Sequence, residues 1–335
     1  MGLAAITGRP IRIEKVRAGR LKPGLGAQHL TAVRAVAAVC GAELSGDSLG
    51  SPILEFRPRH RPRYADYEFD VAEAREGGSA GAATLVLQAV LAPLLRADGN
   101  STVTVRGGTH MTWSPPFDYL RDVWLAAVAR MGAEIEIELR RSGWFPVGQG
   151  EIRAHVRPSG STTLRSLQLV DRGELRLVTG RAIAADLPSH IAQRMVDRAS
   201  ARLRAAGHST DIVPERLRAA CPGAGIFLTA EYEGVRCGFN AIGRIGKPAE
   251  AVADEAVDAL LHHHSSPAVV DEHLGDQLLV PYALASGIST LIADTVSPHL
   301  QTNAWVIEQF GLARVEVARQ DSGAMLVTVA PTSTG

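Results

Sequence analysis

The residues best suited to chemistry lie near the end of the sequence, between Asp294 and Asn303. An apolar run from Ser289 to Ala293 precedes them, and a helical pattern that ends at Gly311 follows. Because proline is favoured in the first turn of a helix, the pair Pro298-His299 is predicted where a strand passes into a helix. Free N–H groups at a helix start attract anions, so a phosphate could lie beside this imidazole. A structural or merely exposed histidine would fit the same pattern.

Lysine is scarce in this chain, which narrows the candidates for a covalent nucleophile. Lys15, Lys22 and Lys247 are the only lysines among the 35 basic residues, and none begins the KxDG motif of lysine-dependent nucleotidyl transfer. A covalent nucleotidyl transfer would therefore have to use histidine. The sequence also lacks a GxxxxGK[ST] loop and a GxGxxG turn after its first strand, which argues against a Walker-type ATPase and a dinucleotide oxidoreductase.

Three copies of a helix–strand–helix–strand–strand pattern indicate an α/β fold. The segments Cys40–Leu44 and Met131–Ile135 match, and each is the end of a helix followed by a strand. Phe56-Arg57-Pro58, Val156-Arg157-Pro158 and Ala330-Pro331 close the three copies. With a spacing of about 90 to 100 residues, such repeats are related α/β units packed around a shared axis (βαβαββ-like) rather than a thin solenoid.

Periodicity predicts the elements of each repeat. For the first repeat we expect a strand at 11–16, a helix at 28–39 and strands at 42–44 and 53–56. For the second repeat we expect a helix at 84–95, a strand at 101–105 and a helix at 117–131. For the third repeat we expect a helix at 275–285, a strand at 289–293, a helix to 310 and strands at 313–318 and 325–329.

A block that breaks the repeat is predicted to form a smaller, inserted α/β domain. Its expected elements are a strand at 175–184, a helix at 188–206, strands at 225–233 and 235–242, and a helix at 248–264. The predicted division is a large domain of residues 1–173 and 268–335, with the inserted domain at 174–267.

The repeats place three comparable loops ahead of their second helices. These loops hold Arg17, Arg20 and Lys22, then the segment Gly107–His110, then His299. If the loops converge, cations, backbone N–H groups and one candidate nucleophile would share a cleft that suits phosphate-bearing ligands. Alternatively, the arginines form a solvated loop.

Composition describes a soluble globular protein with a full-sized core. The chain has 335 residues, is 46% hydrophobic and 21% charged, and its 35 basic and 35 acidic residues cancel, so net charge does not indicate nucleic-acid binding. Three cysteines without CxxC spacing argue against a disulfide framework or a structural zinc site and fit a reducing cytoplasm. No apolar run has the length of a membrane span, so we expect a cytoplasmic protein.

Several stretches resemble the RNA 3'-terminal phosphate cyclases, in that family's order and across almost the whole chain. They are Glu14–Leu25, Gln28–Ala32, Thr84–Gln88, Gly107–Thr109, Gly243–Glu250, Asp276–Leu278 and His299–Asn303. The family's fold, three repeated α/β units plus an inserted α/β domain, is similar to the one that the repeats indicate.

The resemblance implies an enzyme, a ligase that forms phosphoric-ester bonds. His299 would attack the α-phosphate of ATP, release pyrophosphate and carry AMP on an imidazole nitrogen. AMP would pass to an RNA 3'-phosphate, and the neighbouring 2'-hydroxyl would then close a 2',3'-cyclic phosphate and release AMP. A divalent cation, magnesium or manganese, would neutralise phosphate charge. The implied partners are ATP and an RNA with a 3'-phosphate end; neither the metal ligands nor an oligomeric state follows.

The resemblance also assigns binding residues. It implies that Pro115 or Pro116 lies against the adenine and that Arg17, Arg20 and Gln28 bind phosphates of ATP or of the RNA end. The remaining nucleotide-binding residues would be Gln88, His273, Leu274, Gly275, Asp276 and Gln277.

The sequence departs from the family's pattern in three places. Met1 falls inside the helix that should follow a first strand and a Gly-Glu-Gly-Gly-Gly-Gln segment, so we expect the first repeat to lack one strand. Gln149 replaces the middle glycine of the Gly-x-x-Pro-x-Gly-Gly-Gly signature, and His273 replaces a tyrosine that stacks on adenine.

Two other functions remain open. A non-catalytic relative could act as an RNA-processing scaffold, although such relatives lose the nucleophile and His299 is present. An enolpyruvyl transferase has similar repeated units and an arginine-lined cleft, but it would need neither a histidine nucleophile nor a nucleotide.

Overall fold

The structure, a computed structural model, describes residues 1–74, 79–158 and 164–332. The chain forms two compact units. We call them the N-terminal unit (Met1–Phe117, Ala133–Thr162 and Ala219–Cys221) and the C-terminal unit (Asp118–Gly132, Thr163–Arg218 and Pro222–Gly335). The predicted domain boundaries at 173 and 268 remain a prediction.

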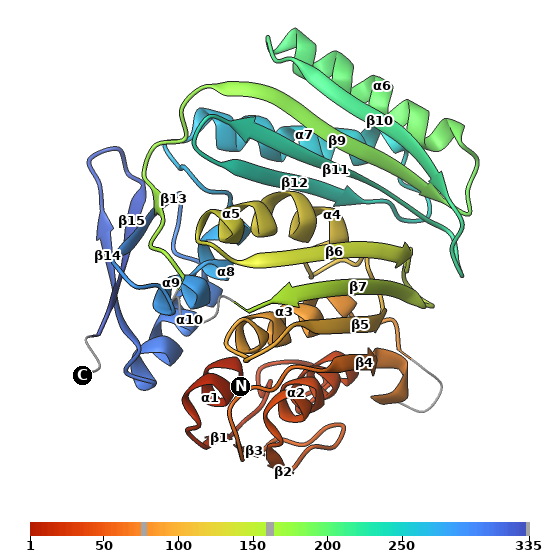
Figure 1. The fold of residues 1–335 in the computed structure, drawn as a ribbon. Helices are drawn as coiled ribbons and strands as arrows, with labels where there is room; N and C mark the ends of the chain where they lie inside the picture. Colours follow the sequence, from red (N-terminus) through yellow and green to blue (C-terminus); the bar gives the residue numbers. More distant parts are fainter. Residues whose placement is uncertain (75–78, 159–163, 333–335) are drawn as a thin grey trace. The chain divides into compact units, whose positions relative to one another are not determined.

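Three repeats of one strand order confirm the predicted fold class. The second repeat has β4 (Asp66–Asp70), β5 (Ser101–Gly107), β6 (Glu134–Arg141) and β7 (Gly150–Arg157) in the order β4-β5-β7-β6 (Figure 1). The third repeat has the same order in β8 (Gln168–Leu169), β13 (Ser289–Ala293), β15 (Met325–Pro331) and β14 (Ala313–Arg319). In both repeats the first strand pairs parallel with the second.

The first repeat follows the same order with fewer strands. Its sheet, β1-β3-β2, consists of β1 (Ile11–Ile13), β3 (Leu54–Arg57) and β2 (Glu43–Ser45), and it has three strands within the described residues. These correspond to the second, fourth and third strands of the other repeats.

Helices of the N-terminal unit pack between its sheets β1-β3-β2 and β4-β5-β7-β6. They are α1 (Gly2–Thr7), α2 (Ala27–Cys40) and α3 (Ala83–Leu94), with a 3-10 turn, η1 (Val71–Ala74). Leu25, Leu30, Val33 and Leu54 form a buried cluster that fixes α2 against β3. Gly41 ends α2 at φ 58°, a left-handed conformation that glycine adopts without a Cβ penalty.

The structure differs from three of the predicted elements. The first strand ends at Ile13 instead of residue 16, because Lys15 and Arg17 have φ near +54° and +52° and turn the chain. The helix predicted at 117–131 is divided into α4 (Phe117–Tyr119), a π-helix η2 (Leu120–Trp124) and α5 (Leu125–Arg130). The helix predicted at 275–285 begins earlier and is divided into α8 (Glu272–Gln277) and α9 (Leu279–Ala283).

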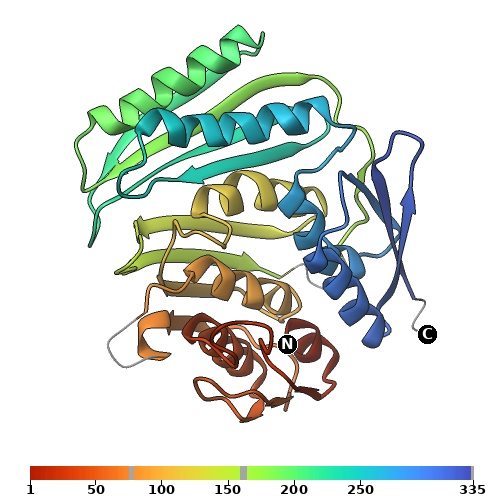
Figure 2. The same ribbon diagram turned by 180° about the vertical axis from the view of Figure 1, so that it is seen from behind.

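The inserted segment forms a four-stranded sheet with two helices. Strands β9 (Leu175–Ala185), β10 (Thr210–Leu217), β11 (Gly223–Tyr232) and β12 (Arg236–Ile242) have the order β10-β9-β11-β12. Helices α6 (His190–Ala205) and α7 (Ala249–Ser265) pack side by side on this sheet (Figure 2). Arginines one helical turn apart on α6 bond carboxylates one turn apart on α7: Arg194–Glu250, Arg198–Asp254 and Arg202–Asp258.

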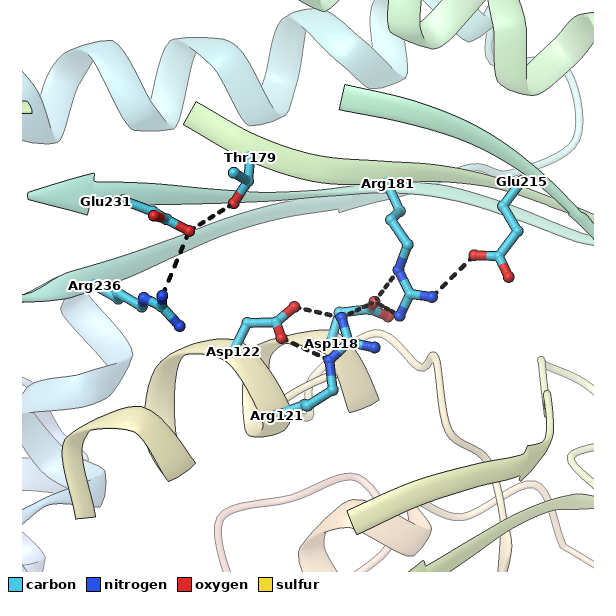
Figure 3. Close-up of polar contacts among 8 residues, drawn as sticks. All are labelled: Asp118, Arg121, Asp122, Thr179, Arg181, Glu215, Glu231 and Arg236. Carbon is cyan, nitrogen blue, oxygen red and sulfur yellow. Dashed lines mark hydrogen bonds and ion pairs between the residues drawn. The ribbon is translucent and has the colours of Figure 1, made fainter. Parts of the chain in front are cut away.

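Arg181 joins the other face of this sheet to the helical segment 118–130 (Figure 3). Its Nε donates to Asp118 Oδ1 at 3.0 Å, and its Nη1 donates to Glu215 Oε2 at 3.0 Å. The Asp118 side chain is only 5% exposed and also accepts from Arg121 at 3.3 Å. Because a buried carboxylate is costly without a cation, these ion pairs hold the segment on β9 and β10.

Within the described residues, no helix is both long and apolar enough to span a lipid bilayer. The cysteines Cys40, Cys221 and Cys237 are free and buried.

We predict that Arg181→Met lowers the free energy of unfolding by about 2–3 kcal/mol, because Asp118 would keep its burial and lose its main cation. The control is Arg176→Ala on the same strand, whose pair with Glu233 leaves the arginine 69% exposed, and we expect about 0.5 kcal/mol or less for it. Urea denaturation of both variants checks this. Equal losses in the two variants would contradict the assigned role of Arg181.

Candidate active site

His299 lies at the start of helix α10 (Pro298–Gln309), directly after β13 and its short loop. Ser297 caps the helix, since its Oγ accepts a hydrogen bond from the Leu300 N–H at 3.0 Å, and Pro298 occupies the first turn. The imidazole is exposed. The predicted position of this histidine between a strand and a helix is therefore confirmed.

Asn303 fixes α10 to α8 one turn beyond the histidine. Its Nδ2 donates to the backbone carbonyl of Asp276 at 3.1 Å. Because residues four apart lie on one side of a helix, His299 is presented on the same side as this contact. A role for Asn303 was not predicted, although its spacing of four residues from His299 is a signal for one.

The Asp276 carboxyl lies within electrostatic range of His299. Burial raises the pKa of Asp276 from its usual value to about 6, while the charges of His299 and His273 act in the opposite direction. Asp271 and Glu272 add to the increase. This acid therefore changes its charge close to neutral pH, a property common at catalytic sites and also found in structural ion-pair networks.

Asp271 is the buried carboxylate that anchors α8. Its Oδ1 accepts hydrogen bonds from the N–H groups of His273 and Leu274, both at 3.0 Å, and from the Tyr119 hydroxyl at 2.7 Å. Its Oδ2 accepts from the Gly238 N–H at 3.0 Å. Burial raises the pKa of this carboxyl, and the hydrogen bonds act against that increase. With four donors it caps the helix and ties it to β12 and to the segment 118–130.

Helical segment 118–130 supports α8 at both ends. Besides Tyr119, the Trp124 indole N–H donates to the Gln277 carbonyl at 3.3 Å. A Cβ at Gly238 would lie 2.4 Å from the Tyr119 ring, so only glycine lets the ring approach β12. Tyr119 and Asp271 lie 152 residues apart in sequence, and sequence reasoning missed the pair.

The segment predicted to bind the nucleotide lies in helix α8, and its residues differ in their exposure to solvent. His273 is exposed, and its ring meets the Tyr119 ring edge-on at 6.2 Å. Asp276 and Gln277 are half-buried, whereas Leu274 and Gly275 are buried and would offer only backbone to a ligand. The C-terminal unit thus brings His299, Asp276 and His273 together.

The N-terminal unit brings Arg17 and Gln28 together around the start of α2. Arg17 Nη1 donates to the Gly24 carbonyl at 2.9 Å and bends the loop back on itself. Burial and the Arg17 charge both lower the pKa of the neighbouring His29. Gln28 Oε1 accepts from the Ala82 N–H at 3.0 Å, which ties α2 to the start of α3.

The other predicted residues of this unit lie in separate places. Arg20 is exposed in the loop before α2, and Gln88 is half-buried on α3. In the loop that follows β5, Pro115 is half-buried and Pro116 is buried. The convergence of the three loops on one cleft stays a prediction.

His110 serves packing rather than ligand contact. It is 1% exposed, it stacks on Trp144 with ring centroids 4.7 Å apart, and its Nδ1 lies 2.7 Å from Thr109 Oγ1. Of the two histidines in the three loops, only His299 is exposed.

The glycine signature after β6 is a close-packed turn. A Cβ on Gly143 would lie 2.4 Å from the Gly150 backbone, so these glycines permit the approach of two chain segments. Gln149 has φ 56°, the left-handed region that favours glycine, which explains why glycine suits this position.

A shallow polar groove of about 410 Å³ lies elsewhere, on the sheet β4-β5-β7-β6. Its charged residues include Arg106, which is paired with Glu151 and Glu68, and none of its lining residues belongs to the predicted site. The described part of the chain holds no group of three His, Cys, Asp or Glu residues that could bind a metal ion.

Three α/β repeats, an inserted α/β segment and an exposed histidine at a helix start define the class of protein. Residues 1–317 match the RNA 3'-terminal phosphate cyclase family. Proteins named RNA 3'-terminal phosphate cyclase include one from Methylococcus capsulatus, 55% identical over 329 residues that cover 98% of this chain and 91% of the relative. Another, from Gloeothece citriformis, is 48% identical over 96% of this chain and 91% of its own length. A third, from Methanopyrus kandleri, is 40% identical over 99% of this chain and 94% of its own length.

The match covers nearly the whole chain and agrees with the repeated fold. This chain belongs to the RNA 3'-terminal phosphate cyclase family.

Proposed function

We propose that this protein uses ATP to convert an RNA 3'-terminal phosphate into a 2',3'-cyclic phosphodiester, with His299 as the nucleophile. The observation that carries the proposal is the exposed imidazole at the start of α10, whose charge acts on the Asp276 carboxyl. Family membership supports the overall reaction, and the surroundings of His299 support the covalent route.

In the first step an unprotonated imidazole nitrogen of His299 attacks the α-phosphorus of ATP. A nitrogen–phosphorus bond forms, the bond to the bridging oxygen breaks, and pyrophosphate leaves. The attack gives the ring a positive charge, which the ionised Asp276 stabilises through the charge interaction between the two groups. The positive end of the α10 helix dipole favours the phosphate oxygens.

In the second step an oxygen of the RNA 3'-phosphate attacks the same phosphorus, and the nitrogen–phosphorus bond breaks. His299 is restored, and the RNA carries an activated adenylate. In the third step the neighbouring 2'-hydroxyl attacks the 3'-phosphorus and releases AMP. Histidine suits this relay because it is a nucleophile near neutral pH and a good leaving group once it carries a phosphoryl group.

The remaining residues are proposed to bind rather than react. The exposed His273 ring and the half-buried Pro115 offer surfaces for the adenine, whereas Pro116 is buried; Gln88 and Gln277 offer amides to the nucleotide. Arg17 and Arg20 suit the phosphates through bidentate contacts, and Gln28 holds the start of α3 beside them.

A divalent cation would neutralise phosphate charge in such a reaction. The described residues form no cluster that would hold it, so we assign no residue to a metal and no step depends on one.

We predict that ATP labelled on its α-phosphate labels the protein, and that the label is lost in His299→Ala. The label should be acid-labile, as a phosphoramidate is, and removable by hydroxylamine. His155→Ala is a matched control, because His155 is exposed on β7 in the other unit and should leave labelling unchanged. Undiminished labelling in His299→Ala would overturn the covalent route, and no labelling of the wild-type protein would favour the scaffold.

We predict that Asp276→Asn slows labelling by about tenfold at pH 7.5, the order of a lost charge-assisted contact. The raised pKa, about 6, means that the wild-type carboxyl is protonated below pH 6 and ionised above it. The wild-type rate divided by the Asp276→Asn rate should therefore rise with pH through about 6. A ratio that does not change between pH 5 and 8 would remove Asp276 from the step.

A further inference from the structure

Trp113 is an unusual surface residue. It is 99% exposed, so its large apolar ring contributes no burial to folding. Its φ of 67° lies in the left-handed region, which costs a bulky residue on the order of 1–2 kcal/mol. A residue that is both strained and exposed suggests a use outside folding.

Phe145 is a second exposed aromatic residue in the same unit. It is 72% exposed and follows the buried Trp144 in the turn between β6 and β7. The Gly148 N–H donates to the Trp144 carbonyl at 2.6 Å and closes this turn. The ring is thus presented to solvent by a backbone that is held in place.

The two loops that carry these rings are joined at their bases. The N–H groups of Thr109 and His110 both donate to the Gly143 carbonyl, at 2.9 and 3.1 Å. His110 stacks on Trp144, and the Phe117 N–H closes the loop onto the Thr109 carbonyl at 2.9 Å.

Strand directions put both loops at the same end of the sheet, where β5 and β6 terminate. Strands β5 and β6 each run antiparallel to β7, so their carboxyl ends lie on the same side. Trp113 follows the end of β5 and Phe145 follows the end of β6. The two exposed rings therefore lie at the same end of the sheet β4-β5-β7-β6.

We propose that Trp113 and Phe145 form a stacking platform for unpaired nucleobases near the 3' end of the RNA. The inference rests on the proposed function for its ligand. Single-stranded RNA is commonly held by exposed aromatic faces, and a rigid platform keeps the entropic cost of binding low. The enzyme would then require a 3' end whose last bases are unpaired.

The nearby charge suits a nucleic acid. Arg141 is exposed at the end of β6, four residues before Phe145, and it is outside the ion pairs found in the described chain. An exposed guanidinium at the end of the strand that leads to Phe145 can bind a backbone phosphate while the bases stack.

The test measures the dissociation constant of a fluorescent, single-stranded 3'-phosphorylated oligoribonucleotide by anisotropy at fixed salt, a readout that does not need catalysis. We expect Trp113→Ala and Phe145→Ala each to weaken binding about tenfold, the value typical of a lost base stack. Trp113→Phe should keep most of the affinity. The control is Tyr64→Ala. Tyr64 is 56% exposed and precedes β4, which runs parallel to β5, so it lies at the opposite end of the same sheet.

A second arm uses the same oligonucleotide with abasic residues at its last two positions. The loss should be about a hundredfold for the wild-type protein, about tenfold for Trp113→Ala, which keeps the Phe145 stack, and absent for the double variant, since each ring and its base act as a pair. Additive losses, or unchanged affinity in the aromatic variants, would overturn the platform.

AMP labelling distinguishes this proposal from the proposed function. It should be unchanged in Trp113→Ala, and a raised KM for ATP in that variant would assign the ring to adenine and overturn the platform. Failure of the wild-type protein to label would count against the histidine route alone, because RNA binding is measured separately. We expect the melting temperatures of Trp113→Ala and Phe145→Ala to equal that of the wild type, because both rings are exposed. This result would exclude misfolding as the cause of weaker RNA binding.

Discussion

A single buried carboxylate organises the histidine side of the site. Asp271 is 2% exposed, caps α8 with two backbone hydrogen bonds, and accepts two more from Tyr119 and Gly238. An unsatisfied carboxylate at this depth would destabilise the fold by several kcal/mol, so the four donors must be in place together. The positions of α8, β12 and the helical segment 118–130 therefore depend on one another.

The proposed chemistry follows from that arrangement. Because α8 is held at Asp271, the Asp276 carbonyl is available to Asn303, and this contact sets α10 and hence His299. The charge of the exposed His299 imidazole lowers the pKa of the partly buried Asp276, against the larger effect of burial. A nucleophile that becomes positive during the reaction gains most from a carboxylate that is already positioned, because no reorganisation is needed.

Local signals predicted the repeated elements well. Strand 289–293 was predicted with its observed bounds, and Gly41 and Pro298 marked a helix end and a helix start that the structure confirms. Strands β4, β8 and β10 were missed for identifiable reasons. Strand β8 has only two residues, and β4 is short and contains three acidic residues. Strand β10 contains Pro214, which argues against a strand in sequence, but proline is tolerated because β10 is an edge strand.

The site was predictable only in part. A strand–helix junction and a scarcity of lysine pointed to His299, and a resemblance supplied the residues for the nucleotide. Tyr119, Asp271 and Gly238 meet through tertiary packing, which no periodicity in one sequence encodes. The pKa of Asp276 likewise depends on burial, which becomes visible only in the folded chain.

The most direct test of the account is peptide mass spectrometry of the protein after incubation with ATP, digested at neutral or alkaline pH to preserve a phosphoramidate. The account predicts one AMP adduct, on the peptide that contains His299, and its loss after brief acid treatment. An adduct on a peptide that contains Lys15, Lys22 or Lys247, or an acid-stable adduct elsewhere, would contradict it.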